Sequence, residues 1–451
     1  MTKKLNFSII WKSLVIGVLI LLMLIPLAFV RKTIKERFEY KYAATSEIIS
    51  SWGDQILIAA PILNIPYTVQ YRDREDNGKT WSTRTEYAKF SPKDLDVDVN
   101  VISQTRYIGI FEVPVFTAEI TMKGSFEKFK KPADAKENES FISLEINDLK
   151  GISTPVFVWN GQKAEFEPAI IGMPLSIRMP NVRRYSSEMS YTRYYDYEET
   201  NRLKSLNSRV ILNDNNTFEI KFNIKGSNAI SFIPLAKDNR FHIYSKWTNP
   251  NFSGTFLPDT KEINNEGFSA TWNINYIASG NPPRIDGLNL SYSLFTTTLL
   301  VPVDSYRAAE RAVKYGILFI TLTFLACFVF EITSEKPIHP FQYLLVGFAM
   351  AIFYILLVSI SEFIPFGFAY LIAAVSVIAL ITAYIKFAVI KNLNIKQTAV
   401  VASSMSALYI YLYVLLQLQD MALIFGSVSL FLGLAIVMYA TRNINWYEER
   451  E

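Results

Sequence analysis

Six long apolar segments, unevenly spaced, constrain the fold of this chain more than any other feature. A membrane-spanning helix needs about 20 mainly apolar residues, and residues 31–312 contain no segment of that kind. We therefore predict one N-terminal span at residues 14–30 and five spans near the C-terminus, at residues 313–330, 341–360, 366–385, 398–418 and 421–439.

This layout predicts an α + β membrane protein in which a large extracytoplasmic domain is inserted between a single N-terminal helix and a C-terminal five-helix bundle. The predicted parts are a cytoplasmic tail with the first span (1–30), the large domain (31–312), the bundle (313–440) and a cytoplasmic tail (441–451). Lys3, Lys4 and Lys12 resemble the charged start of a signal peptide. However, the apolar run is long and no A-x-A site follows it, so we predict an uncleaved anchor.

The composition excludes several classes of function. The chain has 45 basic and 41 acidic residues, a balance that does not favour nucleic-acid binding. Its one cysteine, Cys327, lies in a predicted span, so the large domain is expected to fold without disulfides. The two histidines are far apart and no nucleotide, metalloprotease or hydrolase motif occurs. We therefore expect no metal, no cofactor and no enzymatic activity.

Basic residues in the short loops predict the orientation of the spans. Loops 361–365 and 419–420 contain no lysine or arginine, whereas the loop after residue 385 carries Lys386, Lys391 and Lys396. Because basic loops stay in the cytoplasm, both termini are predicted to be cytoplasmic and the large domain periplasmic. Arg31, Lys32, Lys35 and Arg37 oppose this orientation, but long translocated domains follow the rule poorly.

The large domain has the alternating pattern of antiparallel strands that are buried on one face. Apolar residues alternate with polar ones at positions 95–101, 116–122, 218–224 and 268–274. Asn77-Gly78 and Asn160-Gly161 are Asn-Gly pairs, the preferred residues of a two-residue hairpin turn. We therefore predict a β sandwich or a large twisted antiparallel assembly.

Two patterns in the large domain leave alternatives open. Residues 120–126 resemble residues 222–228, which is explained either by chance or by two related β lobes. Residues 183–198 interleave tyrosine with charge. Such a segment is either an exposed loop or the lining of a groove for a glycan or peptide.

Polar residues at the ends of the predicted spans are the candidate site residues, because ionisable groups are costly near a bilayer. Glu331–Arg442 is an expected ion pair, and interfacial snorkelling or helix capping is the alternative for every member. The candidates are Glu331, His339, Gln342, Glu362, Asp420 and Arg442.

Small residues recur on one face of the last predicted span, at steps of four, three and four. They are Ala422, Gly426, Ser429 and Gly433. Small residues allow close contact between membrane helices, so we predict that this face packs against another helix.

Eight strings distributed along the whole chain form a recognisable set. They are residues 245–258, 267–272, 311–324, 328–331, 339–347, 353–362, 422–427 and 441–446. Together these strings resemble the CreD family of bacterial inner-membrane, cell-envelope integrity proteins. The chain departs from the family pattern at Phe363, where the family often has His, and at Gln419, where it often has Glu.

The resemblance implies a role in envelope integrity and the envelope stress response, but it supplies no ligand and no catalytic residue. We expect a non-enzymatic protein of the bacterial inner membrane whose outer domain binds or braces an envelope component or a membrane protein partner. A transporter or lipid-handling protein that uses the bundle is the alternative. An enzyme would need a carboxylate or a Ser/Lys cluster in the outer domain.

Overall fold

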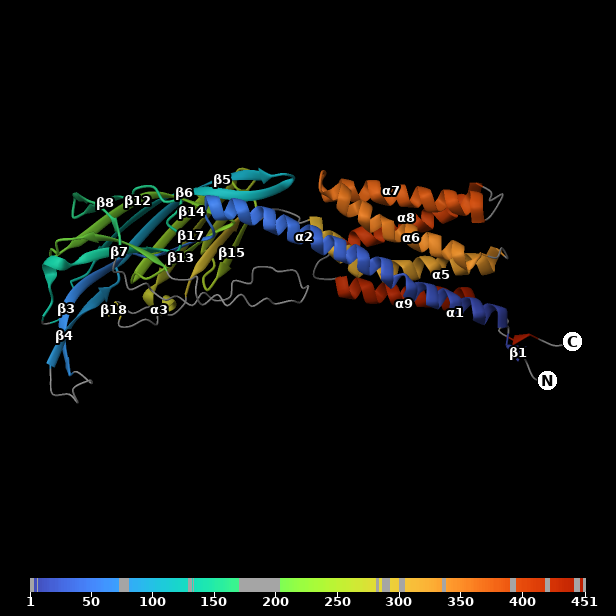
Figure 1. Ribbon diagram of the computed structural model, residues 1–451, viewed down its shortest axis with the longest axis horizontal. Coiled ribbons are helices and arrows are strands. Elements are labelled where there is room, and N and C mark those ends of the chain that lie inside the picture. The colour runs from blue at the N-terminus through green and yellow to red at the C-terminus, as the bar shows by residue number, and fades with distance from the viewer. Residues whose placement is uncertain are drawn as a thin grey trace. The chain divides into compact units, whose positions relative to one another are not determined.

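The computed structural model describes residues 4–5, 7–72, 81–128, 132, 134–169, 203–280, 284–285, 293–299, 305–334, 338–389, 395–417, 422–441 and 447–448. The chain divides into two compact units (Figure 1). The helical unit contains Met1–Tyr42 and Val303–Glu451, and the β unit contains Ala43–Pro302.

The β unit consists of two sheets. In the eight-stranded sheet the order of strands is β16 (Thr260–Asn264), β17 (Gly267–Asn275), β14 (Asp238–Ser245), β5 (Asp94–Ile108), β6 (Phe111–Phe126), β12 (Asn216–Ser227), β8 (Val156–Trp159) and β9 (Gln162–Ala164). Two short helical turns, η1 (Glu137–Glu139) and α3 (Tyr276–Ser279), lie between strands of this unit.

The ten-stranded sheet is the second layer. Its main path runs in the order β15 (Pro250–Gly254), β19 (Phe295–Leu299), β13 (Ala229–Ile233), β2 (Ile56–Ala59), β7 (Phe141–Ile146), β3 (Ile62–Arg72), β4 (Trp81–Phe90) and β18 (Arg284–Ile285). Off this path, β11 (Lys204–Arg209) pairs with β7, and β10 (Glu167–Pro168) pairs with β11.

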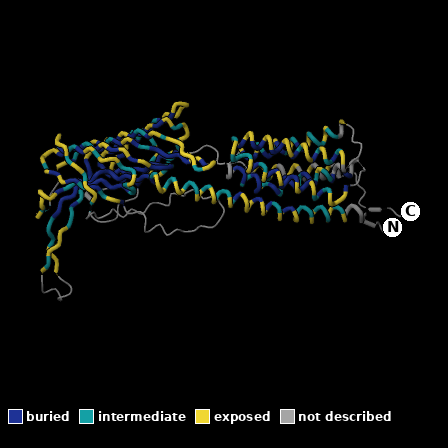
Figure 2. Tube along the Cα trace, turned by 45° about the horizontal axis from the view of Figure 1, so that its top comes forward, coloured by how far each residue is buried: buried dark blue, intermediate teal, exposed yellow. Residues whose placement is uncertain are grey.

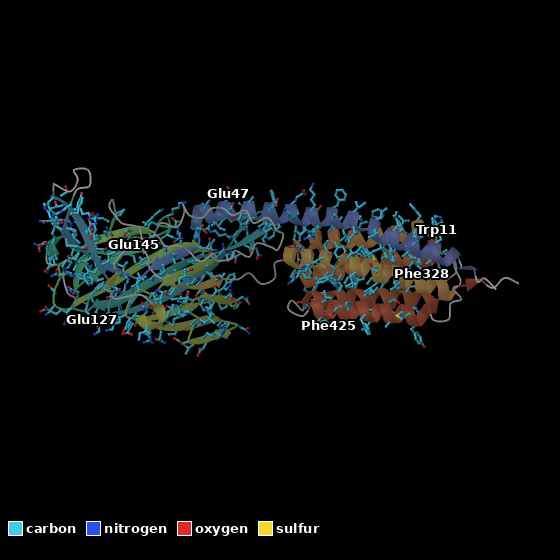
Figure 3. The ribbon with its side chains drawn as sticks, turned by 90° about the horizontal axis from the view of Figure 1, so that it is seen from below. Trp11, Glu47, Glu127, Glu145, Phe328 and Phe425 are labelled. Atoms are coloured by element: carbon cyan, nitrogen blue, oxygen red, sulfur yellow. The ribbon has the colours of Figure 1, made fainter. Side chains whose placement is uncertain are left out.

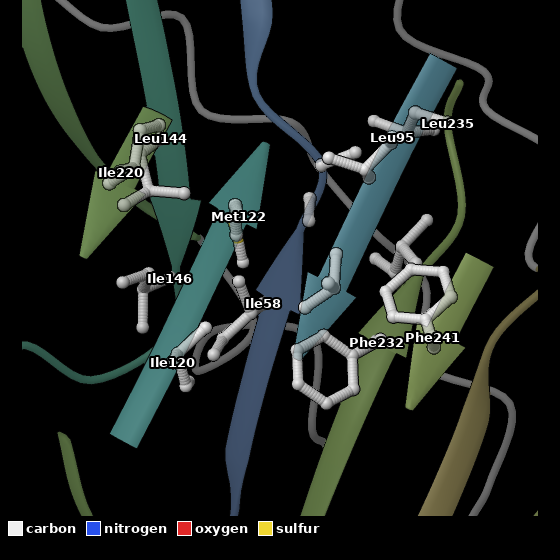
Figure 4. Packing of buried hydrophobic residues seen from close by; sticks show 14 of the residues in the cluster. Ile58, Leu95, Ile120, Met122, Leu144, Ile146, Ile220, Phe232, Leu235 and Phe241 are labelled. Atoms are coloured by element: carbon white, nitrogen blue, oxygen red, sulfur yellow. The ribbon is translucent and has the colours of Figure 1, made fainter. Parts of the chain in front are cut away.

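One apolar core joins the two sheets and confirms the predicted alternation. On β5, Leu95, Val97 and Val99 are buried while Asp96 and Asp98 between them are exposed. Figure 2 shows buried residues concentrated between the layers, and Figure 4 shows side chains of β2, β5, β6 and β7 meeting in one cluster. Burial of this apolar surface supplies the main stabilisation of a domain without disulfides.

Most strand pairs are antiparallel, as predicted, but two are parallel: β2 with β13 and β5 with β14. The Asn160-Gly161 turn is confirmed, because both residues have positive φ, 48° and 81°, between β8 and β9. Asn77-Gly78 and residues 183–198 lie outside the described residues.

The helical unit contains an N-terminal helix and a C-terminal group of apolar helices, which confirms the predicted fold class. By length and composition, four described helices are long and apolar enough to cross a membrane, and the number is five if the pair bent by 48° at Lys314–Gly316 is one span. The helices are α1 (Phe7–Leu22), α2 (Leu24–Trp52), α4 (Ser305–Lys314), α5 (Gly316–Ser334), α6 (Pro340–Ser361), α7 (Phe366–Tyr384), the π-helical η2 (Ile385–Val389), α8 (Ile395–Gln417) and α9 (Ala422–Thr441).

The N-terminal helix is longer than its apolar segment. The helix is interrupted only at the buried Met23, and it continues 22 residues beyond residue 30, as far as Trp52. Its end is held on the β unit, because the Trp52 Nε1–H donates to the Phe116 carbonyl at 3.3 Å. Arg106 and Lys225 lie 4.0 and 4.7 Å from the centre of the Trp52 ring, within the range of cation–π attraction.

Candidate functional site

Glu331 is the centre of a polar cluster between three helices of the helical unit. Lys12 on α1 places its Nζ 2.5 Å from Glu331 Oε1, and the Tyr343 hydroxyl of α6 donates to Oε2 at 3.0 Å. Both carboxylate oxygens of this side chain, which is only 7% exposed, therefore have partners. We call Lys12, Glu331 and Tyr343 the Glu331 cluster.

The Glu331 cluster compensates a carboxylate that is otherwise unfavourably placed. Glu331 lies in the last turn of α5, where the helix dipole repels negative charge. It is also surrounded by apolar helices, where an unpaired charge is costly. The ammonium of Lys12 and the hydroxyl of Tyr343 offset both effects, so the cluster joins α1, α5 and α6.

A second charged contact joins α2 to the other end of α6. Arg37 donates from Nε to Glu362 Oε1 at 2.7 Å and from Nη2 to Oε2 at 2.5 Å. This two-bond geometry is the strong form of an arginine–carboxylate pair. Glu362 caps the C-terminal end of α6 and is 8% exposed, so Arg37 neutralises a charge at the negative end of a helix.

The two contacts lie a membrane thickness apart. Tyr343 is in the first turn of α6 and Glu362 is at its end. Lys12 and Arg37 are 25 residues apart, about 37 Å along a helix axis at 1.5 Å per residue. A bilayer has a hydrocarbon core of about 30 Å. The N-terminal helix is thus joined to α5 near one edge of the apolar layer and to α6 near the other.

His339 and Gln342 form the N-terminal cap of α6. The His339 Nδ1 accepts from the Phe341 backbone N–H at 3.2 Å, and the Gln342 Oε1 accepts from the His339 N–H at 3.0 Å. This reciprocal arrangement is a capping box, with Pro340 at the start of the helix. His339 and Gln342 therefore act as helix-capping residues, which is the alternative role that the sequence analysis gave them.

The remaining candidates are only partly described. Asp420 and Arg442 lie outside the described residues, so the expected Glu331–Arg442 pair is not observed. The small residues Ala422, Gly426, Ser429 and Gly433 lie on α9. Only Gly426 has a described environment, and no described atom lies within 4 Å of the place where its Cβ would stand.

A cluster of tyrosine side chains lies between α6, α7 and α8. The Tyr370 hydroxyl donates to the Tyr409 carbonyl at 2.6 Å, and Tyr413 packs 5.0 Å from Tyr370, centre to centre. Phe353 packs edge to face on Tyr354, Tyr370 and Tyr409. This cluster places hydroxyl groups inside an otherwise apolar bundle.

The β unit contains a buried carboxylate that the sequence analysis did not single out. Glu145, labelled in Figure 3, lies on β7 and is 3% exposed. It accepts a hydrogen bond from the Ser205 hydroxyl of the neighbouring β11. Its Oε2 is buried and has no hydrogen-bond partner within the described part of the chain. An acceptor left in this state costs about 1–3 kcal/mol.

Polar side chains of adjacent strands share the face of Glu145. Ser143 lies two residues earlier on β7 and accepts from the Asn64 amide at 3.0 Å. Lys89 on β4 is opposite Asn64 in the strand register. We call Asn64, Lys89, Ser143, Glu145 and Ser205 the Glu145 cluster.

The environment of this cluster shifts the protonation of both charged groups toward the neutral form. Burial raises the pKa of Glu145, and the Ser205 hydrogen bond and the Lys89 charge oppose this shift only in part. Burial lowers the pKa of Lys89, with the charge of Glu145 acting in the opposite direction. A carboxyl of this kind can take up and release a proton above the ordinary range of glutamate. Among the described residues, no group of side chains is suited to bind a metal ion.

The sequence contained only a weak signal for these sites. Ser143 and Glu145 alternate with Ile142 and Leu144, a pattern that ordinarily indicates a solvated strand face. Lys12 precedes the first apolar segment and looks like a charge flanking a signal anchor. Its partner Glu331 is 319 residues away along the chain, so no local spacing could predict their contact.

The N-terminal helix, the inserted β sandwich and the C-terminal apolar helices define an integral membrane protein with a large β-rich domain. Comparison with known proteins agrees with this class. The sequence model of a family described as inner membrane protein CreD matches residues 8–447. The chain therefore belongs to the CreD family of inner membrane proteins.

A curated relative agrees with this assignment over nearly its full length. The chain is 29% identical to the inner membrane protein CreD of Escherichia coli (strain K12) over 452 aligned residues. The alignment covers 98% of this chain and 95% of the relative. Membership of this family places the protein in the inner membrane.

Proposed function

We propose that this protein is a non-enzymatic component of the inner membrane that supports envelope integrity. Its β unit lies outside the cytoplasm and binds or braces an envelope component or a partner protein. Both termini lie in the cytoplasm, and the apolar helices cross the membrane.

Two observations support this orientation. The loop after residue 385 is rich in lysine, whereas the loop at 361–365 contains no basic residue. In addition, β1 (Lys4–Leu5) near the N-terminus pairs with β20 (Tyr447–Glu448) near the C-terminus. Paired termini require an even number of crossings, which agrees with one span before the β unit and five after it.

The contacts of the N-terminal helix with α5 and with the C-terminal end of α6 carry the proposal. A simple anchor needs only apolar contact with lipid, yet this helix is joined by Lys12 to Glu331 and by Arg37 to Glu362. The same helix continues to Trp52, whose ring is held by groups of the β unit. A helix with this set of contacts is suited to couple the apolar helices mechanically to the β unit.

Cross-linking in living cells tests the proposal. Photo-reactive residues placed at exposed positions of the β unit, such as Lys163 and Lys261, are expected to capture an envelope component or a membrane protein partner. Deletion of the gene is expected to weaken tolerance of envelope stress. Absence of any captured partner, together with normal tolerance in the deletion strain, would contradict the proposal.

Transport or lipid handling by the bundle is the second candidate, and the tyrosine cluster favours it. Hydroxyl groups of Tyr370, Tyr409 and Tyr413 in an apolar interior could contact a polar ligand. Neutral substitution of Glu331 and Glu362, with Tyr370→Phe, is expected to abolish a transport-linked phenotype. If these variants remain folded and fully complement the deletion, this candidate is eliminated.

An enzymatic role would rest on the Glu145 cluster, which contains the carboxylate, lysine and serines that such a role needs. Glu145→Gln retains the shape of the side chain but cannot exchange a proton. Under our proposal this variant complements the deletion strain as well as the unchanged protein does. Loss of complementation by a variant that is normally folded would instead favour catalysis at Glu145.

A further inference from the structure

The β5–β6 hairpin extends beyond the rest of its sheet. β14 pairs with β5 only as far as Val101, and β12 pairs with β6 only from Val115 onward. Within the described part of the chain, residues 102–114 therefore form a two-stranded ribbon with no neighbouring strand on either edge (Figure 1).

The tip of this ribbon exposes large apolar side chains. Tyr107 is 65% exposed and Ile110 is 39% exposed, and they flank the turn residue Gly109, whose φ is +57°. Arg106 stands next to Tyr107. Tyrosine, arginine and branched aliphatic residues together are typical of segments that lie at the interface between lipid and water.

Both connections of the β unit to the apolar helices attach at the base of this ribbon. On the entry side, Trp52 donates to the Phe116 carbonyl at 3.3 Å, and the Ser227 N–H donates to the Asp54 carbonyl at 3.2 Å. On the exit side, the Leu299 N–H donates to the Asn228 carbonyl at 2.8 Å.

The exit connection is bonded to the ribbon itself, and it is separated from the next apolar helix by only a few residues of sequence. The Asn228 N–H donates to the carbonyl of Pro114, the last residue of the ribbon. Only five residues separate Leu299 from the start of α4 at Ser305. The ribbon thus projects from the end of the β unit at which the chain enters from a membrane helix and leaves for the next.

We propose that the tip of the β5–β6 hairpin inserts into the interfacial region of the bilayer that the protein spans. Tyr107 lies at the level of the lipid headgroups, and Ile108 and Ile110 contact the upper acyl chains. Burial of these apolar groups in lipid stabilises the contact. The hairpin gives the β unit a third membrane contact, in addition to the two chain connections.

The β3–β4 hairpin provides a matched control. Tyr71 also stands next to an arginine, Arg72, and is 40% exposed. However, β2 and β3 both run antiparallel to β7, so the chain moves continuously away from α2 between Ile56 and Arg72. Tyr71 therefore lies at the end of the sheet remote from both connections.

Lipid-borne quenching of a fluorescent label tests the proposal. Cys327→Ala removes the one native cysteine, and Tyr107→Cys or Tyr71→Cys then introduces a single site for an environment-sensitive label. The full-length protein is reconstituted in vesicles of phosphatidylethanolamine and phosphatidylglycerol. Quenching is measured with bromine on shallow acyl positions of the lipid and with iodide in the water.

We expect the label at residue 107 to be quenched several-fold more strongly by brominated lipid than the label at residue 71, and less by iodide. Equal behaviour at the two sites, with full access to iodide, would overturn the proposal. Protection of residue 107 from both quenchers would also overturn it, because a protein surface would then cover the tip. Ile110→Cys provides a second reporter if Tyr107→Cys does not fold.

Discussion

Two carboxylates of the helical unit, Glu331 and Glu362, are held by partners on other helices. Glu331 and Glu362 both lie near helix C-termini, where their charge is unfavourable, and Lys12 and Arg37 offset it. In the β unit, by contrast, Glu145 is buried with one oxygen lacking a partner among the described residues. The paired carboxylates Glu331 and Glu362 join helices to one another. The buried Glu145, whose pKa is raised, instead makes the free energy of unfolding depend on pH.

Glu145→Gln is expected to stabilise the protein at neutral pH. Burial raises the pKa of Glu145 above its ordinary value of 4.5, so the folded state binds the proton more tightly than the unfolded state. The favourable contribution is fully present below about pH 4.5 and is lost as pH rises through the higher folded-state pKa. Glutamine stays neutral at every pH. The unfolding temperature of the Glu145→Gln variant should therefore fall less between pH 5 and 8 than that of the original protein.

Thermal unfolding followed by tryptophan fluorescence measures this difference. The expected gain at pH 7 is about 1–3 kcal/mol, because glutamine keeps the shape of the side chain but removes the buried charge. Glu262→Gln, at an exposed position of β16, provides a matched control with no expected change. Parallel pH profiles for the original protein and Glu145→Gln would contradict the assigned pKa shift.

Glu362→Gln is expected to destabilise the helical unit by about 1–3 kcal/mol. This is less than the loss at a fully buried ion pair, because Arg37 is 39% exposed. A double-mutant cycle with Arg37→Gln should give a coupling free energy of the same sign and similar size. The measurement is unfolding of the purified protein in detergent.

Glu36→Gln is the matched control for this cycle. Glu36 pairs with Lys32 on the same helix, and both side chains are largely exposed, so the change should stay within about 0.5 kcal/mol. If Glu362→Gln has no larger effect than Glu36→Gln, the Arg37–Glu362 contact does not stabilise the helical unit.

At the scale of elements, close packing of α6 depends on a glycine. A Cβ on Gly347 would meet the Met23 sulfur at 2.5 Å and the Phe324 ring at 3.0 Å. Met23 is the residue at which the N-terminal helix is interrupted, and it is fully buried. Gly347 therefore lets the junction of α1 and α2 lie directly against α6.

Gly347→Val should destabilise the helical unit by about 1–3 kcal/mol through overpacking. Gly426→Val on α9 is the matched control, because no described atom lies within 4 Å of its Cβ position. Unfolding in detergent compares the two variants. A larger loss at Gly426 than at Gly347 would instead support the predicted packing face at Ala422, Gly426, Ser429 and Gly433.

Some elements could be predicted from the sequence and others could not, for physical reasons. The strand at Leu95–Val101 was predictable because burial of one sheet face requires a period of two. The extension of α2 to Trp52 was not, since Arg31, Lys32, Lys35 and Arg37 look like the polar flank of a span. Its helical state depends on contacts made at both ends, by Arg37 with Glu362 and by Trp52 with the β unit.

The candidate site shows the same division. Glu331 and Glu362 were identifiable because charge near a bilayer needs compensation. Their partners were not, because Lys12 and Arg37 are 319 and 325 residues distant along the chain. The burial of Glu145 was not identifiable either, because Ser143 and Glu145 alternate with apolar residues in the pattern that ordinarily indicates a solvated strand face.

At the scale of the whole molecule, the account depends on which side of the membrane the β unit occupies. Every proposed contact with an envelope component requires this unit to be outside the cytoplasm. The pairing of β1 with β20 places the two described terminal segments on the same side, which agrees with the proposed even number of crossings.

Labelling of single cysteines in intact cells tests this claim most directly. In a Cys327→Ala background, Lys163→Cys reports on the β unit and Lys391→Cys on the lysine-rich loop between predicted spans. A membrane-impermeant maleimide, applied after permeabilising only the outer membrane, should label residue 163 and not residue 391. Labelling of residue 391 with protection of residue 163 would contradict the account.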